Sequence, residues 1–159
     1  MSTHVFTELL RSDMTPSFGV TEPGAIALAV SRARSFTEGE IKSIELSVNS
    51  GIYKNSFTCG IPGTDEIGIP FAAALGAVAG DWTKGLEALG KASQLDLARA
   101  QVLLDAGKVH VELHEISSAL YINARVSAGS HTAEVTITGT HTNISSIIVD
   151  GESLIRQEA

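Results

Sequence analysis

Two short polar segments carry residue types that could do chemistry. The first is YKNSFTCGIPGT, residues 53–64, where glycine and proline free the backbone to turn. Its polar side chains include those of Lys54, Asn55, Thr58 and Thr64. A lysine ammonium beside backbone N–H groups would suit a carboxylate or a phosphate. The glycine spacing matches neither a phosphate-binding loop nor a dinucleotide fingerprint, and spacing alone favours an ordinary connection with a solvated lysine.

The second segment is GTHTNIS, residues 139–145. If it is extended, His141 and Asn143 project to one face, and Thr140 and Thr142 project to the other. Histidine transfers protons near neutral pH, and asparagine can hold a carboxylate or an amide. A polar strand end in an exposed sheet explains the segment equally well.

A third feature is the helix start in SFGVTEPGAIALAV, residues 17–30. Thr21 can cap the helix, and Glu22 and Pro23 suit its first turn. The unpaired N–H groups of a helix N-terminus, with their partial positive charge, form a natural anion site. The same residues also suit an ordinary helix.

Other reactive side chains have simpler explanations. His110, Glu112 and His114 share one face of a predicted strand, but solvated polar side chains are more usual there than a metal site. Cys59 has no histidine nearby in the sequence to activate it, so a small buried residue is the better interpretation. Trp82 is expected to be a packing residue.

The composition limits the class of protein. The 159 residues suffice for one domain with a core, and the net charge of −7 without a basic stripe argues against nucleic acid or an anionic membrane as partner. One cysteine excludes an internal disulfide and an all-cysteine metal site within this chain. No signal peptide is visible, and the longest apolar run, residues 67–80, is too short to span a bilayer. A soluble cytoplasmic protein is therefore expected.

Hydrophobic periodicity predicts helices in the first two thirds of the chain and strands mainly in the last third. Expected helices cover residues 4–12, 21–36, 70–79 and the leucine-spaced region 81–108, which stops at Gly107. The segment 50–64 is expected to be an irregular loop. Helix 21–36 should turn Ile26, Val30 and Ala33 to one face. The small residues of helix 70–79 should let another backbone come close.

Alternating apolar and polar residues predict the strands. They are expected at 41–49, 108–115, 119–127, 131–139 and 145–155, the last with an Asp150–Gly151 hairpin signal. Short connections favour an antiparallel sheet with helices packed on one face. The fold is thus expected to be α+β, a single domain over residues 1–159.

Taken in order, these segments resemble the iron–sulfur L-cysteine desulfidases and the alpha chain of iron–sulfur L-serine dehydratases. GVTEPGAIALA resembles the family's Gly-Cys-Thr-Glu-Pro helix start, and YKNSFTCGIPGT its Lys-Asn loop ending in Pro-Gly-Thr. GIPFAAALGAVAGDWTKGLEAL carries the Ala-Leu-Gly and Gly-Leu-Glu elements, and TGTHTNI resembles the His-Thr-Asn segment. The resemblance covers nearly the whole chain.

Two departures accompany this resemblance. The family protein is much longer, and its mostly helical C-terminal part supplies further cysteine ligands to the [4Fe–4S] cluster. The motif cysteine is Val20 here, and valine cannot bind iron. Cys59 does not occupy the ligand position of the family.

The resemblance implies a chemistry and a set of residues. In the family, a cluster iron with an open site polarises the leaving group while a base removes the α-proton, and the resulting enamine hydrolyses to a keto acid and ammonia. By resemblance His141 and Lys54 would be catalytic. The substrate-binding residues would be Thr21, Glu22, Asn55, Thr64, Thr142 and Asn143. No residue of this chain is expected to ligate a metal.

Three functions remain open. The leading hypothesis is one subunit of a split iron–sulfur lyase or dehydratase, with a second chain that resembles the missing C-terminal half and ligates the [4Fe–4S] cluster. The close-packing helix 70–79 and the truncated resemblance support it. The alternative is a non-catalytic binding or scaffolding subunit that kept the fold and lost the cluster. A metal-free enzyme with His141 as base ranks last, because nothing in the sequence supplies the electrophile.

Overall fold

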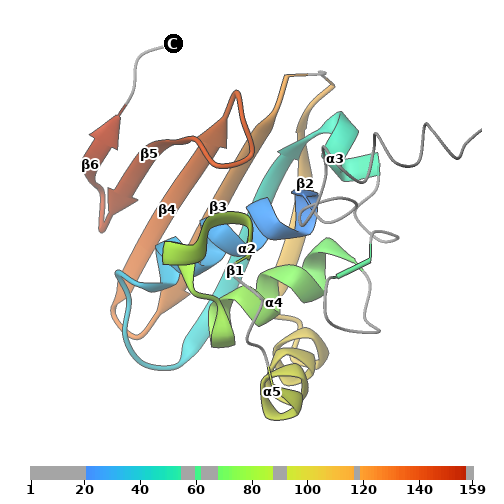
Figure 1. The fold of residues 1–159 in the computed structure, drawn as a ribbon. Helices are drawn as coiled ribbons and strands as arrows, with labels where there is room; N and C mark the ends of the chain where they lie inside the picture. Colours follow the sequence, from blue (N-terminus) through green and yellow to red (C-terminus); the bar gives the residue numbers. More distant parts are fainter. Residues whose placement is uncertain (1–20, 55–59, 62–67, 88–92, 117–118, 157–159) are drawn as a thin grey trace, which may run out of the picture.

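The chain folds into one layer of sheet and a layer of helices (Figure 1). The computed structural model describes residues 21–54, 60–61, 68–87, 93–116 and 119–156. The elements are α2 (Thr21–Arg34), β1 (Ile41–Asn49), α3 (Ser50–Lys54), α4 (Ile69–Ala79), the 3₁₀ helix η1 (Trp82–Glu87), α5 (Gln94–Asp105), β2 (Val109–Glu115), β3 (Tyr121–Ala128), β4 (His131–Thr138), β5 (Ile144–Val149) and β6 (Glu152–Arg156). The helix expected at residues 4–12 lies outside the described residues.

Six strands form a single sheet in the order β2-β1-β3-β4-β5-β6. The pairs from β1–β3 to β5–β6 are antiparallel, whereas β1 and β2 are parallel. The α+β class is therefore confirmed, and one pair departs from the antiparallel expectation. The reason is that α3, α4, η1 and α5 all lie between β1 and β2 in the chain, so β2 starts from the same end of the sheet as β1.

One face of the sheet is apolar and the other is polar. On β3, Ile122, Ala124 and Val126 are fully buried, while Asn123 and Arg125 point to the opposite face and are half-buried or exposed. The helices cover only the apolar face, as the alternation of residue types predicted. The hairpin signal is also confirmed, because Asp150 (φ 49°) and Gly151 (φ 86°) both take the positive φ that a two-residue turn between β5 and β6 requires.

Helix α2 is the centre of the core. Ile26, Val30 and Ala33 are fully buried as predicted, but burial extends around the whole helix from residue 23 to residue 31. The cause is a second cover, because α2 packs on β3 and β4 on one side and on α4 and η1 on another. An apolar surface all round is what such a doubly covered helix needs.

Helix α4 supplies the close contact that makes this possible. A Cβ on Gly76 would lie 3.0 Å from the Cα and 3.1 Å from the carbonyl oxygen of Ala27. The small residues of helix 70–79 therefore do admit another backbone, but that backbone is α2 of the same chain. The close packing of helix 70–79 is thus satisfied within this chain and is not evidence for a separate partner.

Two other expectations need correction. The region 81–108 is not one helical run, since Gly85 (φ 57°, ψ −126°) breaks the backbone inside η1 and the Ser93–Asp96 capping box starts α5 afresh. The start of the expected loop 50–64 is helical, because α3 continues directly from β1. Among the described helices, none is long and apolar enough to cross a membrane.

Replacing Gly76 by valine should destabilise the protein by about 1–3 kcal/mol, because backbone atoms of α2 cannot move aside as a side chain can. Urea unfolding at constant pH measures the change. Gly60→Ala is the control, since a Cβ there meets nothing within 4 Å and should change the free energy of unfolding by less than about 0.5 kcal/mol. Equal stabilities for the two variants would contradict the close α2–α4 approach.

Candidate functional site

One end of the sheet brings together three of the segments that carry predicted site residues. Val48 near the end of β1 pairs with Ile122 near the start of β3, which in turn pairs with Ile137 near the end of β4. Neighbouring strands are about 4.8 Å apart, so β1 and β4 leave the sheet about 10 Å from each other. Figure 1 shows α3 and the β4–β5 turn at this upper end of the molecule.

The start of α2 points toward the same end. The other end of the helix lies at the opposite end of the strands, where Arg34 donates a hydrogen bond of 2.8 Å to the carbonyl oxygen of Gly39. Gly129 of the β3–β4 turn lies there too and donates to the carbonyl oxygen of Glu40 at 3.1 Å. The 14 residues of α2 extend about 20 Å from that edge. Thr21 and the half-buried Glu22 therefore lie toward the end from which β1 continues into α3.

Lys54 is the last residue of α3, and its side chain is exposed. The helix begins directly where β1 ends in a register shift between Val48 and Asn49. The other predicted members of this loop, Asn55 and Thr64, lie outside the described residues. Lys54 is thus the part of the Lys-Asn segment that the structure places at this end.

The segment around His141 forms the β4–β5 turn and is not extended. Gly139 has a φ of 79°, and the backbone N–H of Asn143 bonds the carbonyl oxygen of Thr140 at 3.1 Å. The side-chain Nδ2 of Asn143 donates to the carbonyl oxygen of Thr138 at 2.9 Å, so this amide closes its own turn. The expectation that His141 and Asn143 project together from an extended segment was therefore wrong, because a turn has no period of two.

His141 is half-buried in this turn, and Thr142 is exposed. Burial lowers the pKa of the His141 imidazole below its ordinary value of 6.5, because removal from water disfavours the charged form. The ring is consequently neutral at neutral pH and can accept a proton. That protonation state is the one a general base requires.

Two further residues at this end, Asn49 and Tyr121, were not predicted from the sequence. The buried side chain of Asn49 accepts a hydrogen bond of 3.2 Å from the backbone N–H of Tyr121, which joins the ends of β1 and β3. The Tyr121 ring stacks on His114 with centroids 3.9 Å apart and an angle of 16° between the planes. Burial and then the charge of Glu134 raise the pKa of the Tyr121 hydroxyl. The sequence shows only that the polar residue Asn49 ends an otherwise alternating strand. That position does not reveal its hydrogen-bond partner.

The polar face of the sheet has a shallow groove of about 290 Å³ along β1. Its residues are Glu45, Leu46, Ser47, His110, Glu112, Asn123, Arg125 and Glu134. Most of these polar groups bond one another: Arg125 lies 3.2 Å from Glu134, and Ser47 donates to Glu112 at 3.0 Å. Among the predicted site residues that the structure describes, none lines this groove.

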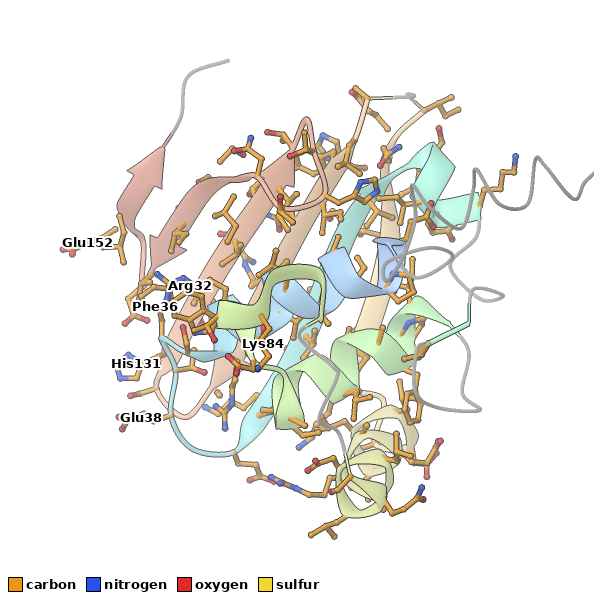
Figure 2. The ribbon with its side chains drawn as sticks, in the orientation of Figure 1. Arg32, Phe36, Glu38, Lys84, His131 and Glu152 are labelled. Carbon is orange, nitrogen blue, oxygen red and sulfur yellow. The ribbon has the colours of Figure 1, made fainter. Side chains whose placement is uncertain are left out.

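The opposite end of the strands carries a different cluster of charged and aromatic side chains, seen in Figure 2 at the left. The Arg32 guanidinium lies 4.7 Å from the ring centroid of Phe36 and 3.8 Å from that of Trp82, and Trp82 packs against the core as predicted. His131 Nδ1 lies 2.7 Å from Asp150 Oδ2, and this hydrogen bond raises the pKa of His131. These contacts hold turns and a helix end together, and none involves a predicted site residue.

The described side chains do not form the donor set of an iron–sulfur cluster. Within the ranges that the structure describes, no three His, Cys, Asp or Glu side chains are grouped to hold a metal ion. His114 and Glu112, two members of the run on β2, are engaged with Tyr121 and Ser47. Cys59 and Val20 lie outside the described residues.

Comparison with known proteins gives a consistent set of relatives. The chain is similar to UPF0597 proteins. It is 37% identical over 158 residues to that of Clostridium botulinum (strain Langeland), a match over 99% of this chain and 37% of the relative. Identity is 36% over 146 residues with the UPF0597 protein of Photobacterium profundum (92% of this chain, 34% of the relative) and 41% over 143 residues with that of Nitratidesulfovibrio vulgaris (89% and 32%).

The chain thus spans about a third of the length of these curated relatives. Their printed name states no activity and no ligand. No family model and no solved structure matches the chain.

The pKa values of His141 and His131 should be shifted in opposite directions from the ordinary histidine value. We expect the His141 imidazole to have a pKa below 6.5 and the His131 imidazole a pKa above 6.5. A ¹H–¹³C NMR titration measures both, with His141→Gln and His131→Gln to assign the signals. A His141 pKa at or above 6.5 would contradict the burial of this ring as the dominant influence on its protonation.

Proposed function

We propose that this chain is one subunit of a split iron–sulfur-dependent lyase or dehydratase and forms the substrate-carboxylate side of its active site. The substrate is a small amino acid, or a hydroxy or thio acid, and the reaction is the α,β-elimination of water or sulfide. The observation that carries the proposal is that α3, the β4–β5 turn and the start of α2 all lie toward the same end of the sheet. The order of the resembling motifs along the chain supports it independently.

Each group at this end has a task that suits its chemistry. The exposed ammonium of Lys54 and the N–H groups at the start of α2, near Thr21 and Glu22, attract the substrate carboxylate. His141, neutral at neutral pH, accepts the α-proton. Thr142 is exposed beside it and offers a hydroxyl to the substrate. Asn55 and Thr64 belong to the substrate-binding set on the strength of the family resemblance.

The elimination leaves a short-lived enamine. From L-serine the α-proton and the β-hydroxyl leave as water, and from L-cysteine the proton and the thiol leave as hydrogen sulfide. Hydrolysis of the tautomerised enamine then releases pyruvate and ammonia. We assign the [4Fe–4S] cluster to a second chain, and we expect the enzyme to act in the cytoplasm.

The curated relatives are longer than this chain. The UPF0597 protein of Clostridium botulinum matches this chain over 37% of its own length, so most of that relative is built from sequence that has no counterpart in these 159 residues. A partner that resembles this remainder would complete the site. Its cysteines would take the place of the motif cysteine that is Val20 here.

A scaffolding subunit is the second candidate. Two observations favour it: Val20 replaces the motif cysteine, and the side-chain amide of Asn143 is used in closing its own turn. A subunit of this kind would keep the fold and bind its partner without contributing to catalysis. The effect of a Lys54 substitution on turnover distinguishes the catalytic function from the scaffolding function.

Replacing Lys54 by alanine should lower kcat/KM of the complex by about 10-fold to 100-fold, the usual value of one charge-assisted hydrogen bond to a carboxylate. The complex is purified anaerobically from native cells carrying the variant. Pyruvate release from L-serine and sulfide release from L-cysteine are then measured.

Lys42→Ala is the matched control, because Lys42 is also exposed but lies near the start of β1, at the other end of that strand. Its kcat/KM should equal that of the wild type. Equal turnover by the Lys54 variant would remove this residue from the site. A stable wild-type complex that turns over neither substrate would favour the scaffolding function.

A further inference from the structure

Two aromatic rings hold one arginine at the end of α2 that is remote from Lys54 and His141. The guanidinium carbon of Arg32 lies 3.8 Å from the ring centroid of Trp82 and 4.7 Å from that of Phe36. The side chain is half-buried and links α2 to η1, which are in contact. Stacking on a ring uses the face of a guanidinium and leaves its in-plane N–H donors for acceptors. Arg32 therefore presents its donors from a fixed position.

The guanidinium of Arg32 has no acceptor among the described residues. Within those ranges it makes the two ring contacts but neither a hydrogen bond nor an ion pair. The other arginines whose side chains the structure describes all have a partner: Arg34 donates to the carbonyl oxygen of Gly39 at 2.8 Å, Arg99 lies 3.9 Å from Asp96, and Arg125 lies 3.2 Å from Glu134. In a chain with 18 acidic and 11 basic residues, a half-buried arginine without a carboxylate calls for an explanation.

The carboxylates closest to this arginine in the chain or in the view do not pair with it. Asp81 lies just before η1, but its Oδ1 accepts a hydrogen bond of 3.1 Å from the backbone N–H of Thr83. Glu38 and Glu152 lie at the same end of the molecule (Figure 2), and neither forms an ion pair with Arg32. The acceptor for this guanidinium is consequently water or a bound anion.

A second cation without a described partner lies on η1. Lys84 is exposed, follows Trp82 by two positions and forms no ion pair within the part of the chain that the structure describes. Arg32 and Lys84 are both labelled in Figure 2. The flexible stem of a lysine lets its ammonium adjust to a ligand that a fixed guanidinium positions. The two positive charges together match a phosphate monoester, which carries a charge of about −1.5 to −2 at neutral pH.

We propose that Arg32 and Lys84 form a binding site for the phosphate group of a small phosphorylated molecule. The in-plane N–H groups of Arg32 donate a bidentate pair of hydrogen bonds to two phosphate oxygens, and Lys84 supplies the second positive charge. The site lies at the opposite end of the strands from the proposed active site, so this inference does not rest on the proposed lyase. The rival explanation is that Arg32 only packs η1 against α2, a role that needs no ligand.

The single tryptophan of the chain provides the probe, because its indole ¹H–¹⁵N signal reports on Trp82 alone. The chain is titrated with sodium phosphate at neutral pH and constant ionic strength, so that general screening does not change during the titration. We expect a saturable shift of the indole signal with a Kd of about 1–10 mM. Arg32→Lys keeps the charge but loses the bidentate geometry, and it should weaken the binding at least about tenfold.

Arg99→Lys is the matched control, since Arg99 is exposed and already lies beside Asp96. Its affinity for phosphate should equal that of the wild type. Thermal unfolding of each variant checks that the fold is intact. If Arg32→Lys unfolds early, Lys84→Glu replaces it, because Lys84 is exposed and its substitution leaves the core unchanged. This charge reversal should abolish the saturable shift.

Titration with sodium acetate tests the class of ligand. Equal affinity for acetate and phosphate would overturn the phosphate assignment in favour of a single carboxylate. A wild-type chain without a saturable shift, or an unchanged affinity in folded Arg32→Lys, would overturn the site and leave Arg32 as a packing residue. These measurements involve neither turnover nor a partner chain, so their failure is distinct from a failure of the proposed lyase.

Discussion

The close approach of α4 to α2 is the constraint on which the rest of the structure depends. At Gly76 the absence of a Cβ lets the α4 backbone approach Ala27 so closely that an added Cβ would lie 3.0 Å from its Cα. This contact lets the apolar middle of α2 lie buried between the sheet and the helical layer. The sheet is anchored in turn, since α2 packs on β3 and β4. The direction of α2, and with it the position of its N-terminus, follows from this packing.

Local features of the sequence predicted most elements. Alternation identified β1, β3 and β4, the Asp150–Gly151 pair identified the last hairpin, and apolar periodicity identified α2 and α4. Each of these signals lies within a dozen or so residues, so nothing distant in the chain can override it easily. The break at Gly85 and the fresh start of α5 at Ser93 were harder, because leucine spacing continues across both.

Features that depend on distant residues were not predictable in the same way. The parallel pairing of β1 and β2 follows from the helical crossover between them, and the sequence carries no local mark of it. The small residues of α4 indicated a close backbone neighbour without saying whose backbone it was, and the structure identifies it as α2 of this chain. In the sequence, Asn49 is an ordinary polar residue at a strand end. Its role follows from the hydrogen bond that its side chain accepts from the distant Tyr121.

The candidate site shows the same division. The sequence identified Lys54 and His141 as polar residues in glycine-containing segments 87 positions apart, and the sheet register brings the ends of their strands together. It also suggested that His141 and Asn143 act side by side, whereas the turn engages the Asn143 amide with Thr138. What remains is an exposed cation, an imidazole with a lowered pKa and a helix start, all toward the same end of the sheet.

Iron and acid-labile sulfide in the anaerobically purified complex test the central claim most directly. A split iron–sulfur lyase predicts about four iron atoms and a similar amount of sulfide per complex, carried by the partner of this chain. The iron should remain when Cys59 is replaced by serine, since no residue of this chain is proposed as a ligand. A stable complex that contains neither iron nor sulfide would contradict the account and leave a scaffolding subunit in its place.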